Sequence, residues 1–297
     1  MRMILVLFSL MAIVCEGKRG RIYLPPTTEA ESIAGSARPE WTPDSPLPND
    51  PRNFWTLSYG LTTYGDLFTP RQLVSLGTFV SLVIEARALI RAHAIKAGVK
   101  DDGVSLAESG SGPTAYAEAV SVYLAFAVGR SADRGSTICS WDSSPKMEAL
   151  RNTFGRQAIP MVWDFAEGNP LSESSGNILN NIEFAAKALD KLPANILGYA
   201  SQADATLVRT PVGPVISSDP PYYDNIGYAD LSDFFYIWLR RSLQPVFPEV
   251  FSTMLVPKTP ELVATPYRHG GKEAAEIFFM DGMTRAIHGM AVRGHQA

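Results

Sequence analysis

The chain has 297 residues, of which 46% are hydrophobic and 19% charged, enough to bury a sizeable core in one large domain or two small ones. Lys and Arg number 26 against 30 Asp and Glu, and the formal charge of -4 gives no footprint for nucleic acid, so any such contact must be local. The two cysteines, Cys15 and Cys139, form no CxxC pair, which argues against a disulfide framework or a cysteine-based zinc site and favours a reducing cytoplasm.

The N-terminal segment has two interpretations. Its basic start and apolar run, MRMILVLFSLMAIVC, are typical of a secretory signal peptide, although Val14 is a poor residue for a cleavage site. The overlapping stretch AIVCEGKRGRIYLPP favours a hairpin that turns between Gly17 and Gly20. The apolar run is too short to span a bilayer readily as a helix, so no membrane partner is predicted. We expect a hairpin or remnant strands over residues 1–24.

Composition divides the rest of the chain into three parts. Residues 25–65 are predicted to be a Pro-rich surface connection, because the prolines between positions 25 and 51 favour neither helix nor central strand. Residues 66–193 have the pattern of a helical region. Residues 194–297 alternate short apolar pieces with turns and acidic residues, which is typical of an α/β protein.

Three helices are predicted in the helical region. The first has Thr69 as N-cap, Pro70 at the first helical position and Gly98 just beyond its end. The second begins at Thr114, and its nearly all-round apolar sequence predicts burial. The third is expected in SSGNILNNIEFAAKALDKLP.

Two acidic residues mark the predicted ligand-binding edge of the C-terminal part. Asp204 and Asp219 each follow a short apolar piece that we expect to be a strand. Parallel strands would bring both carboxylates to the carboxyl edge of the sheet, where open α/β sheets bind ligands. Further on, YADLSDFFYIWLRRSL predicts a helix with these core positions: Leu231, Phe234, Phe235, Trp238 and Leu239.

The segment Asp219-Pro220-Pro221-Tyr222 has the chemistry of a clamp for an exocyclic amine on a nucleobase. Such an amine is a weak nucleophile because its lone pair is delocalised into the ring, so a catalyst must orient it and accept its N–H bonds. The Asp219 carboxylate and the Pro220 carbonyl can accept those bonds, and consecutive prolines stiffen the turn. The Tyr222 ring can stack on a base flipped out of its helix.

These four residues resemble the D-P-P-Y motif of S-adenosylmethionine-dependent amino-methyltransferases. Four longer blocks are similar to consecutive blocks of the large adenine-specific DNA methylases that contain a zinc ribbon: RQAIPMVWDFAEGNP, QADAT, DPPYYDNIGYADLSDFFYIWLRRSL and ELVATPYRHGGKEAAEIFF. The resemblance implies an α/β fold, a partial Rossmann-like class I methyltransferase sheet with a large helical insertion. It implies S-adenosylmethionine as cofactor, DNA as partner, and other restriction-modification or phage-defence components as further partners. Asp219 at the first motif position, where enzymes acting on cytosine N4 more often have Ser, favours adenine N6 as the acceptor.

The resemblance also implies roles for single residues. Asp219 to Tyr222 would be catalytic, and Asp204 matches the acidic position beside the adenine of the cofactor, although acidic residues in turns also satisfy local N–H groups. Tyr223 and Asn225 either shape the base pocket or form the turn before the next helix. Arg268 is predicted to contact backbone phosphate from a mobile basic loop, with a solvated turn as the alternative.

One further block, VWDFAEGNP, lies at an apolar-to-polar transition. Its polar and aromatic residues either form a pocket wall or cap local turns: Trp163, Asp164, Glu167 and Asn169.

The chain also departs from the family. It has neither the glycine-rich F-x-G-x-G cofactor loop nor the zinc-ribbon cysteines, and it ends at AVRGHQA where the family continues with more sheet. We therefore expect a fragment or truncated frame with little activity alone. Two alternatives stay open: an RNA N2-guanine methyltransferase, which shares the D-P-P-Y chemistry, and a non-catalytic nucleic-acid-binding remnant.

Overall fold

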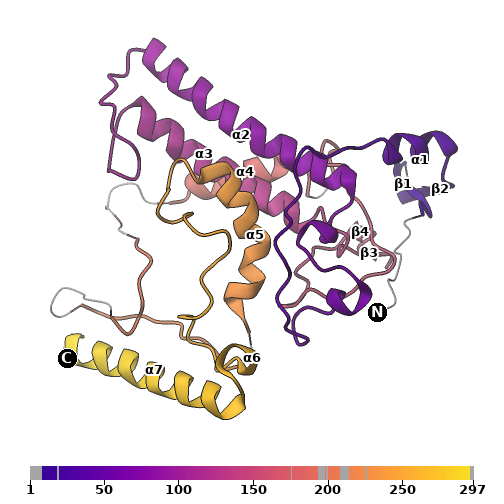
Figure 1. The fold of residues 1–297 in the computed structure, drawn as a ribbon. Helices are drawn as coiled ribbons and strands as arrows, with labels where there is room; N and C mark the ends of the chain where they lie inside the picture. Colours follow the sequence, from indigo (N-terminus) through magenta and orange to yellow (C-terminus); the bar gives the residue numbers. More distant parts are fainter. Residues whose placement is uncertain are drawn as a thin grey trace. The chain divides into compact units, whose positions relative to one another are not determined.

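The computed structural model describes residues 9–18, 20–174, 176–192, 198, 200–207, 214–224 and 226–294. The chain forms two compact units, and its elements are labelled in Figure 1. Unit 1 comprises Met1–Lys191 and Phe234–Leu255, and unit 2 comprises Leu192–Asp233 and Val256–Ala297. Residues 234–255 therefore group with the N-terminal part of the chain, which composition alone does not indicate.

Unit 1 begins with an antiparallel hairpin. β1 (Ile13–Gly17) pairs with β2 (Gly20–Leu24), in a register that puts Ile13 opposite Leu24. Gly20 has a φ of 148°, a backbone conformation that favours glycine and lets the chain reverse. The hairpin predicted from AIVCEGKRGRIYLPP is confirmed.

The Pro-rich connection contains a helix that its composition did not indicate. α1 (Thr28–Gly35) begins two residues after Pro26, and the Thr27 side chain caps it by accepting a hydrogen bond from Ala30 N at 3.1 Å. Its sequence, TEAESIAG, is rich in Ala and Glu, which are strong helix formers. The prolines on either side therefore limit the helix and do not prevent it. The prediction that residues 25–51 contain no helix is wrong for this segment.

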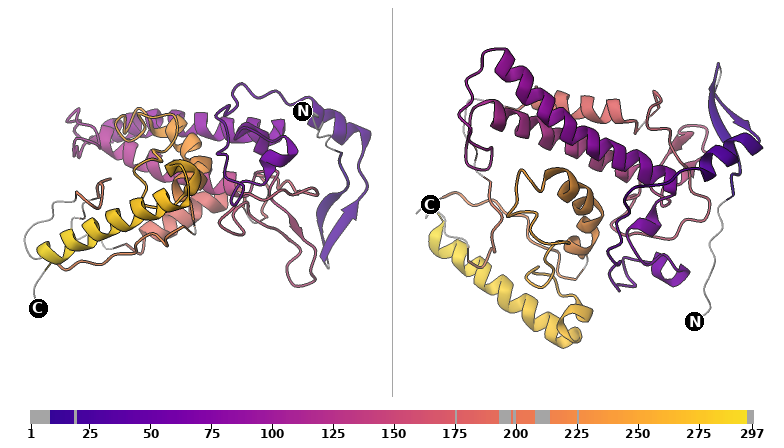
Figure 2. Two further views of the ribbon diagram at one scale, coloured as in Figure 1. Left: turned by 60° about the horizontal axis from the view of Figure 1, so that its bottom comes forward. Right: turned by 45° about the horizontal axis from the view of Figure 1, so that its top comes forward.

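Three helices form the helical region of unit 1, and all three were predicted. α2 (Pro70–Lys96) packs on α3 (Pro113–Asp133), which in turn packs on α4 (Ile178–Leu189), as the views in Figure 2 show. α2 begins with a capping box, in which the Thr69 hydroxyl accepts from Gln72 N at 3.3 Å and Gln72 Oε1 accepts from Thr69 N at 2.8 Å.

One side of α2 is buried and the other is open. Leu73, Leu76 and Val80 are buried, whereas Leu82 and Leu89 are 48% and 59% exposed. Among the described residues, α2 is the one helix whose length and composition would let it cross a membrane, and 22% of its apolar window is buried. The location of the protein in the cell stays a prediction.

Aromatic side chains from distant segments form the core of unit 1. Phe68, just before α2, stacks on Phe234 and meets Trp238 edge-on, with ring centroids 5.4 Å apart in both pairs. Phe154 meets Phe234 edge-on at 5.3 Å. Phe234 and Trp238 come from α5 (Tyr228–Leu243) and are 0% and 1% exposed. Burying such a side chain stabilises the fold by about 1.5–3 kcal/mol. The prediction of Phe234 and Trp238 as core is confirmed.

Short elements complete unit 1. β3 (Trp141–Asp142) and β4 (Ala149–Leu150) pair as a second antiparallel sheet. Two 3₁₀ helices, η1 (Thr56–Tyr59) and η2 (Gly65–Leu67), follow the Pro-rich segment. Their turns carry the chain from that segment to the start of α2.

The described part of unit 2 combines helices with long irregular segments. The first residues of α5 belong to it, together with α6 (Pro266–His269) and α7 (Lys272–Arg293). The helix α7 buries Ala275 and Phe279 against Ala264, with partly buried Leu262 and Met283 beside them.

A parallel sheet is not part of what the structure describes. Residues 200–207 and 214–224 contain no strand, so the strands expected to end at Asp204 and Asp219 are not formed within these ranges. Three prolines between positions 214 and 221 lack an N–H for a sheet ladder. The described chain is thus a mixed fold of helices and two small antiparallel sheets.

Candidate functional site

The segment from Asp219 to Tyr222 lies open on unit 2. The Tyr222 hydroxyl donates a hydrogen bond to Asp219 Oδ1 at 3.0 Å, and the Tyr222 side chain is 55% exposed. This bond to a carboxylate raises the pKa of the Tyr222 hydroxyl above its ordinary value. Pro220 and Pro221 lie between the two residues and restrict φ in the connection. The carboxylate and the aromatic ring of the motif are therefore held together on an accessible surface.

Tyr223 anchors this segment to the body of unit 2. Its φ of 58° is left-handed, which is uncommon for a residue with a side chain and turns the chain sharply after Tyr222. Its carbonyl accepts from Ala264 N at 3.0 Å, and its ring meets Phe279 edge-on at 5.1 Å. A hydrogen bond to Glu276 raises the pKa of the Tyr223 hydroxyl. Contacts with α7 and the segment before α6 thus fix the position of Tyr223.

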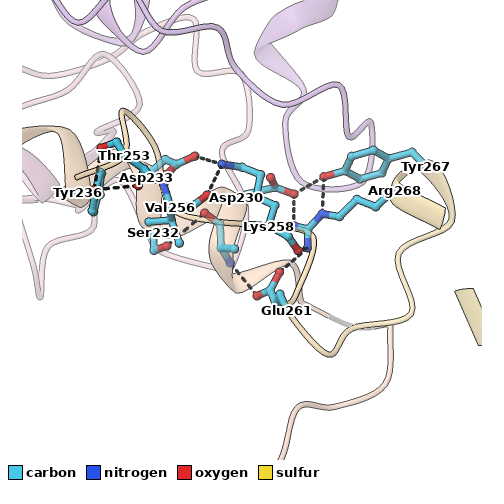
Figure 3. Close-up of polar contacts among 11 residues, drawn as sticks. Asp230, Ser232, Asp233, Tyr236, Thr253, Val256, Lys258, Glu261, Tyr267 and Arg268 are labelled. Atoms are coloured by element: carbon cyan, nitrogen blue, oxygen red, sulfur yellow. Dashed lines mark hydrogen bonds and ion pairs between the residues drawn. The ribbon is translucent and has the colours of Figure 1, made fainter. Parts of the chain in front are cut away.

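An ion-pair network joins the start of α5 to α6 and to the segment before it (Figure 3). Arg268 Nη2 donates to Asp230 Oδ2 at 2.6 Å, and Arg268 Nη1 donates to Glu261 Oε2 at 2.5 Å. The Asp230 side chain is 0% exposed and that of Arg268 is 7% exposed. The Tyr267 hydroxyl also donates to Asp230 Oδ2. Two carboxylates and one guanidinium are thus paired largely away from water, and the phenol of Tyr267, which is 45% exposed, bonds to them from the surface.

The network shifts the titration of its members. Burial by itself would lower the pKa of Arg268, but its hydrogen bonds to Glu261 and Asp230 outweigh burial and raise that pKa. Burial and the bond to Asp230 raise the pKa of Tyr267. Arg268 therefore stays charged and Tyr267 stays neutral throughout the physiological range.

A second buried carboxylate lies one turn along α5. Lys258 Nζ donates to Asp233 Oδ2 at 2.5 Å, and Val256 N donates to Asp233 Oδ1 at 2.7 Å. Burial raises the pKa of Asp233, and the two donors oppose that shift. Glu261 Oε1 accepts from Ala229 N at 2.7 Å, at the start of α5. The segment 256–268 is thereby tied to the first turns of α5 at three points.

Asp204 forms a local turn. Its carboxylate accepts from Thr206 N at 2.8 Å, and its carbonyl accepts from Leu207 N at 2.9 Å. Hydrogen bonds from Thr206 and the charge of Arg285 lower the pKa of Asp204. This is the arrangement expected of an acidic residue that satisfies nearby N–H groups in a turn.

The structure brings together only part of the predicted site. Asp219 and Tyr222 are in direct contact and Tyr223 follows them, whereas the contacts of Asp204 are with its own turn and with Arg285. Asn225 lies outside the described residues.

The block TPYRHGGKE needs a correction. It was expected to be a mobile basic loop, but it forms α6 and the start of α7, and its Arg268 is buried in the ion-pair network. The surrounding carboxylates, Asp230 and Glu261, compensate the arginine charge and offset the cost of removing it from water. Contact of Arg268 with phosphate stays a prediction.

Sequence reasoning missed the two buried carboxylates. Asp230 and Asp233 are three residues apart and lie on the apolar face of α5 that also carries Phe234 and Ile237. Acidic residues on a buried helical face require cationic or N–H partners. The sequence does not identify those partners, because Arg240 and Arg241 follow first and the observed partners, Lys258 and Arg268, lie 25 and 38 positions away from Asp233 and Asp230.

Comparison of the chain with protein-family models, with curated proteins and with solved structures gives no match.

Proposed function

We propose that the segment from Asp219 to Tyr222 holds the acceptor amine of a DNA adenine-N6 methyltransferase that uses S-adenosylmethionine. The observation that carries the proposal is the direct contact between the Asp219 carboxylate and Tyr222 on an exposed surface, at 3.0 Å. The resemblance of D-P-P-Y and its neighbouring blocks to adenine-specific DNA methylases supports the same function. An acceptor site requires hydrogen-bond acceptors beside a flat aromatic surface, and this segment offers both.

The acceptor side of the reaction follows from these groups. The exocyclic amine of adenine has two N–H bonds, and it must be oriented so that its weak lone pair faces the methyl donor. A carboxylate has about four acceptor positions, so the bond from Tyr222 leaves Asp219 able to accept from the amine. The carbonyl of Pro220 is a second acceptor. Developing positive charge on the amine nitrogen is stabilised by the negative charge of Asp219.

Tyr222 would provide the surface for the base. Enzymes that act on a base within DNA extrude it and hold it between aromatic or apolar side chains. The Tyr222 ring is 55% exposed, and the bond from its hydroxyl to Asp219 orients it. The contact of the Tyr223 ring with Phe279 fixes the residue that follows Tyr222 and so limits the movement of Tyr222.

The same groups do not provide a site for the cofactor. S-adenosylmethionine would supply the methyl group, but the described residues of unit 2 do not fit it, since Asp204 is a turn-forming carboxylate and the chain has no F-x-G-x-G loop. We therefore assign Asp204 to the cofactor only as the sequence resemblance implies. The proposal concerns the acceptor amine.

The test is methylation by a protein that carries this segment together with a glycine-rich cofactor loop. Nucleoside mass spectrometry of treated DNA should find N6-methyladenine. Asp219→Ala should lower the rate by about 10²-fold or more, since loss of one preorganised partner typically has this effect. Asp281→Ala, which removes an exposed carboxylate from α7, is the matched control and should leave the rate unchanged.

The alternatives give different results in the same assay. Methylation confined to RNA, with N2-methylguanine as product, would reject the proposal in favour of an RNA enzyme. Binding of DNA without any methylation would reject it in favour of a binding module. Full activity of the Asp219→Ala variant would remove Asp219 from the site.

A further inference from the structure

Unit 1 contains a pocket of about 410 Å³ that the proposed methyl transfer does not use. Its walls are the aromatic and apolar side chains of two segments, with Asn49 and Ser58 as polar groups. The main lining residues are Phe54, Trp55, Leu57, Tyr59, Met161 and Trp163. Clefts that bind small ligands measure about 300–1,000 Å³ and combine apolar walls with a few polar groups. This pocket has that size, and its aromatic side chains stand beside a substantial polar lining.

Backbone hydrogen bonds hold the two segments together. Ile159 N donates to Asn53 O at 2.7 Å, and Trp55 N donates to Ile159 O at 3.1 Å. These bonds form a parallel bridge between Phe54 and Ile159, which are 1% and 0% exposed. The pocket therefore rests on a buried, hydrogen-bonded base and not on mobile loops.

The aromatic rings are fixed yet open to solvent. The Trp55 indole N–H donates to Arg52 O at 3.1 Å, and the rings of Tyr59 and Trp163 meet edge-on at 5.2 Å. Trp55 is nevertheless 40% exposed and Trp163 is 65% exposed. Large rings that are held rigid and left exposed are typical of binding surfaces, because little side-chain entropy is lost when a ligand covers them.

The charge beside the pocket selects the kind of ligand. The guanidinium carbon of Arg156 lies 5.0 Å from the centroid of the Trp55 ring. A positive charge at this position opposes a cationic guest such as a quaternary ammonium group, which aromatic pockets otherwise favour. It favours a planar ring that carries an anionic group nearby. A nucleotide has both features, since its base stacks on aromatic rings and its phosphate pairs with arginine.

We infer that this pocket binds an unpaired nucleotide of single-stranded DNA, with its base against Trp55 and Trp163 and its phosphate near Arg156. The exposed position of Trp163 lets the rest of a strand continue outside the pocket. The choice of a nucleotide rests on the pocket alone. The choice of DNA as its source rests on the proposed function.

The test is binding of a short single-stranded deoxyadenosine oligonucleotide to the full chain, followed by tryptophan fluorescence and by calorimetry. Three probes separate the contributions: an abasic strand of the same length, the same sequence as a duplex, and free deoxyadenosine monophosphate. The oligonucleotide should bind and quench tryptophan fluorescence, whereas the abasic strand and the duplex should bind at least several-fold more weakly. The monophosphate should bind more weakly than the strand.

The variants locate the binding. Trp163→Ala should weaken binding of the oligonucleotide by about 5- to 100-fold, the range that one lost base stack corresponds to, and Trp163→Phe should retain most of the affinity. Arg156→Ala should weaken binding and make it less dependent on salt. Tyr116→Ala removes a 59% exposed aromatic ring from α3 and is the matched control, with no expected change. Circular dichroism and thermal unfolding of each variant show whether it is folded.

Three results would overturn the inference. Equal affinity for the abasic strand would show that the bases are not bound. Equal affinity for the monophosphate would show a pocket for free nucleotides and not for a strand. Unchanged affinity in folded Trp163→Ala would place the binding elsewhere. Each readout is a binding affinity, so loss of the proposed methyl transfer leaves this test intact.

Discussion

Unit 2 contains two tyrosine–aspartate pairs with the same chemistry, whose carboxylates have opposite surroundings. Tyr222 donates to Asp219 on an open surface, and Tyr267 donates to Asp230, which is completely buried beside Arg268. In the open pair the carboxylate keeps acceptor capacity and can bind a ligand. In the buried pair the guanidinium and the phenol both donate to Oδ2 of the carboxylate, and these bonds join the start of α5 to α6. The identity of the residues does not distinguish the two pairs, and the tyrosines are 55% and 45% exposed, whereas the burial of the carboxylates differs.

The largest expected change in stability comes from removing the cation of the buried pair. Arg268→Ala should lower the free energy of unfolding by about 3–5 kcal/mol, because it leaves the buried carboxylate of Asp230 without its cation. Urea denaturation followed by circular dichroism measures the change. Lys272→Ala is the matched control, since Lys272 is 83% exposed and lies 3.8 Å from Glu276, and it should have no measurable effect. Equal stability of the two variants would contradict a structural role for the network.

The second prediction compares the two aspartates directly. Asp230→Asn should lower the free energy of unfolding by about 1.5–3 kcal/mol, because hydrogen bonds from Arg268 to a carboxylate are replaced by bonds to a neutral amide. Asp219→Asn should leave it unchanged, because solvent can replace the lost partner at the surface. The same denaturation curves measure both. A similar loss in the two variants would remove the distinction between the open and the buried pair.

The third prediction uses the dependence of stability on pH. Burial raises the pKa of Asp233 above 3.8, so the folded state holds this proton more tightly than the unfolded state does. The contribution of this group is fully present below its unfolded pKa and is lost as pH rises through its folded pKa. The parent should therefore lose stability relative to Asp233→Asn as pH rises from 3.8 upwards. Parallel curves for the two proteins, from denaturation at several pH values, would show that the shift is absent.

The smallest effect concerns the open pair itself. The bond to Asp219 raises the pKa of Tyr222, so Asp219→Ala should return that pKa towards its ordinary value of 10.0. The pKa of Tyr267 should stay raised in the same variant, because its partner is Asp230. Nuclear magnetic resonance titration of labelled tyrosines measures both. An unchanged Tyr222 titration would mean that the two groups are not bonded in solution.

Local signals in the sequence predicted much of unit 1. Thr69 and Pro70 marked the start of α2, and the hairpin of β1 and β2 followed from turn residues between apolar runs. These features depend on neighbours within a few positions, which is why a single sequence reveals them. Burial of Phe234 and Trp238 also followed from helical spacing, because one face of an amphipathic helix must be covered.

The chemical groups of the candidate site could be predicted from the sequence, but the secondary structure around them could not. The motif from Asp219 to Tyr222 indicated acceptors beside an aromatic ring; the structure shows the Tyr222 hydroxyl bonded to Asp219, and the acceptor role stays a prediction. Within residues 200–207 and 214–224 no strand precedes Asp204 or Asp219, because a strand requires pairing partners that short apolar runs do not specify. Arg268 was mistaken for a surface residue, because a basic residue between turn-forming neighbours looks exposed until its partners are known.

The helix starts, the turn residues and the chemical groups of the D-P-P-Y segment can be read from residues that lie close together in the chain. Which charged side chains are free to meet a ligand depends on long-range contacts. Arg268 is paired because α6 and the start of α5 bring it to Asp230, 38 positions away, and Trp55 and Trp163 line one pocket because a bridge joins Phe54 to Ile159. Long-range contacts set burial, and burial decides whether a carboxylate, an arginine or a tryptophan holds the fold together or meets a ligand.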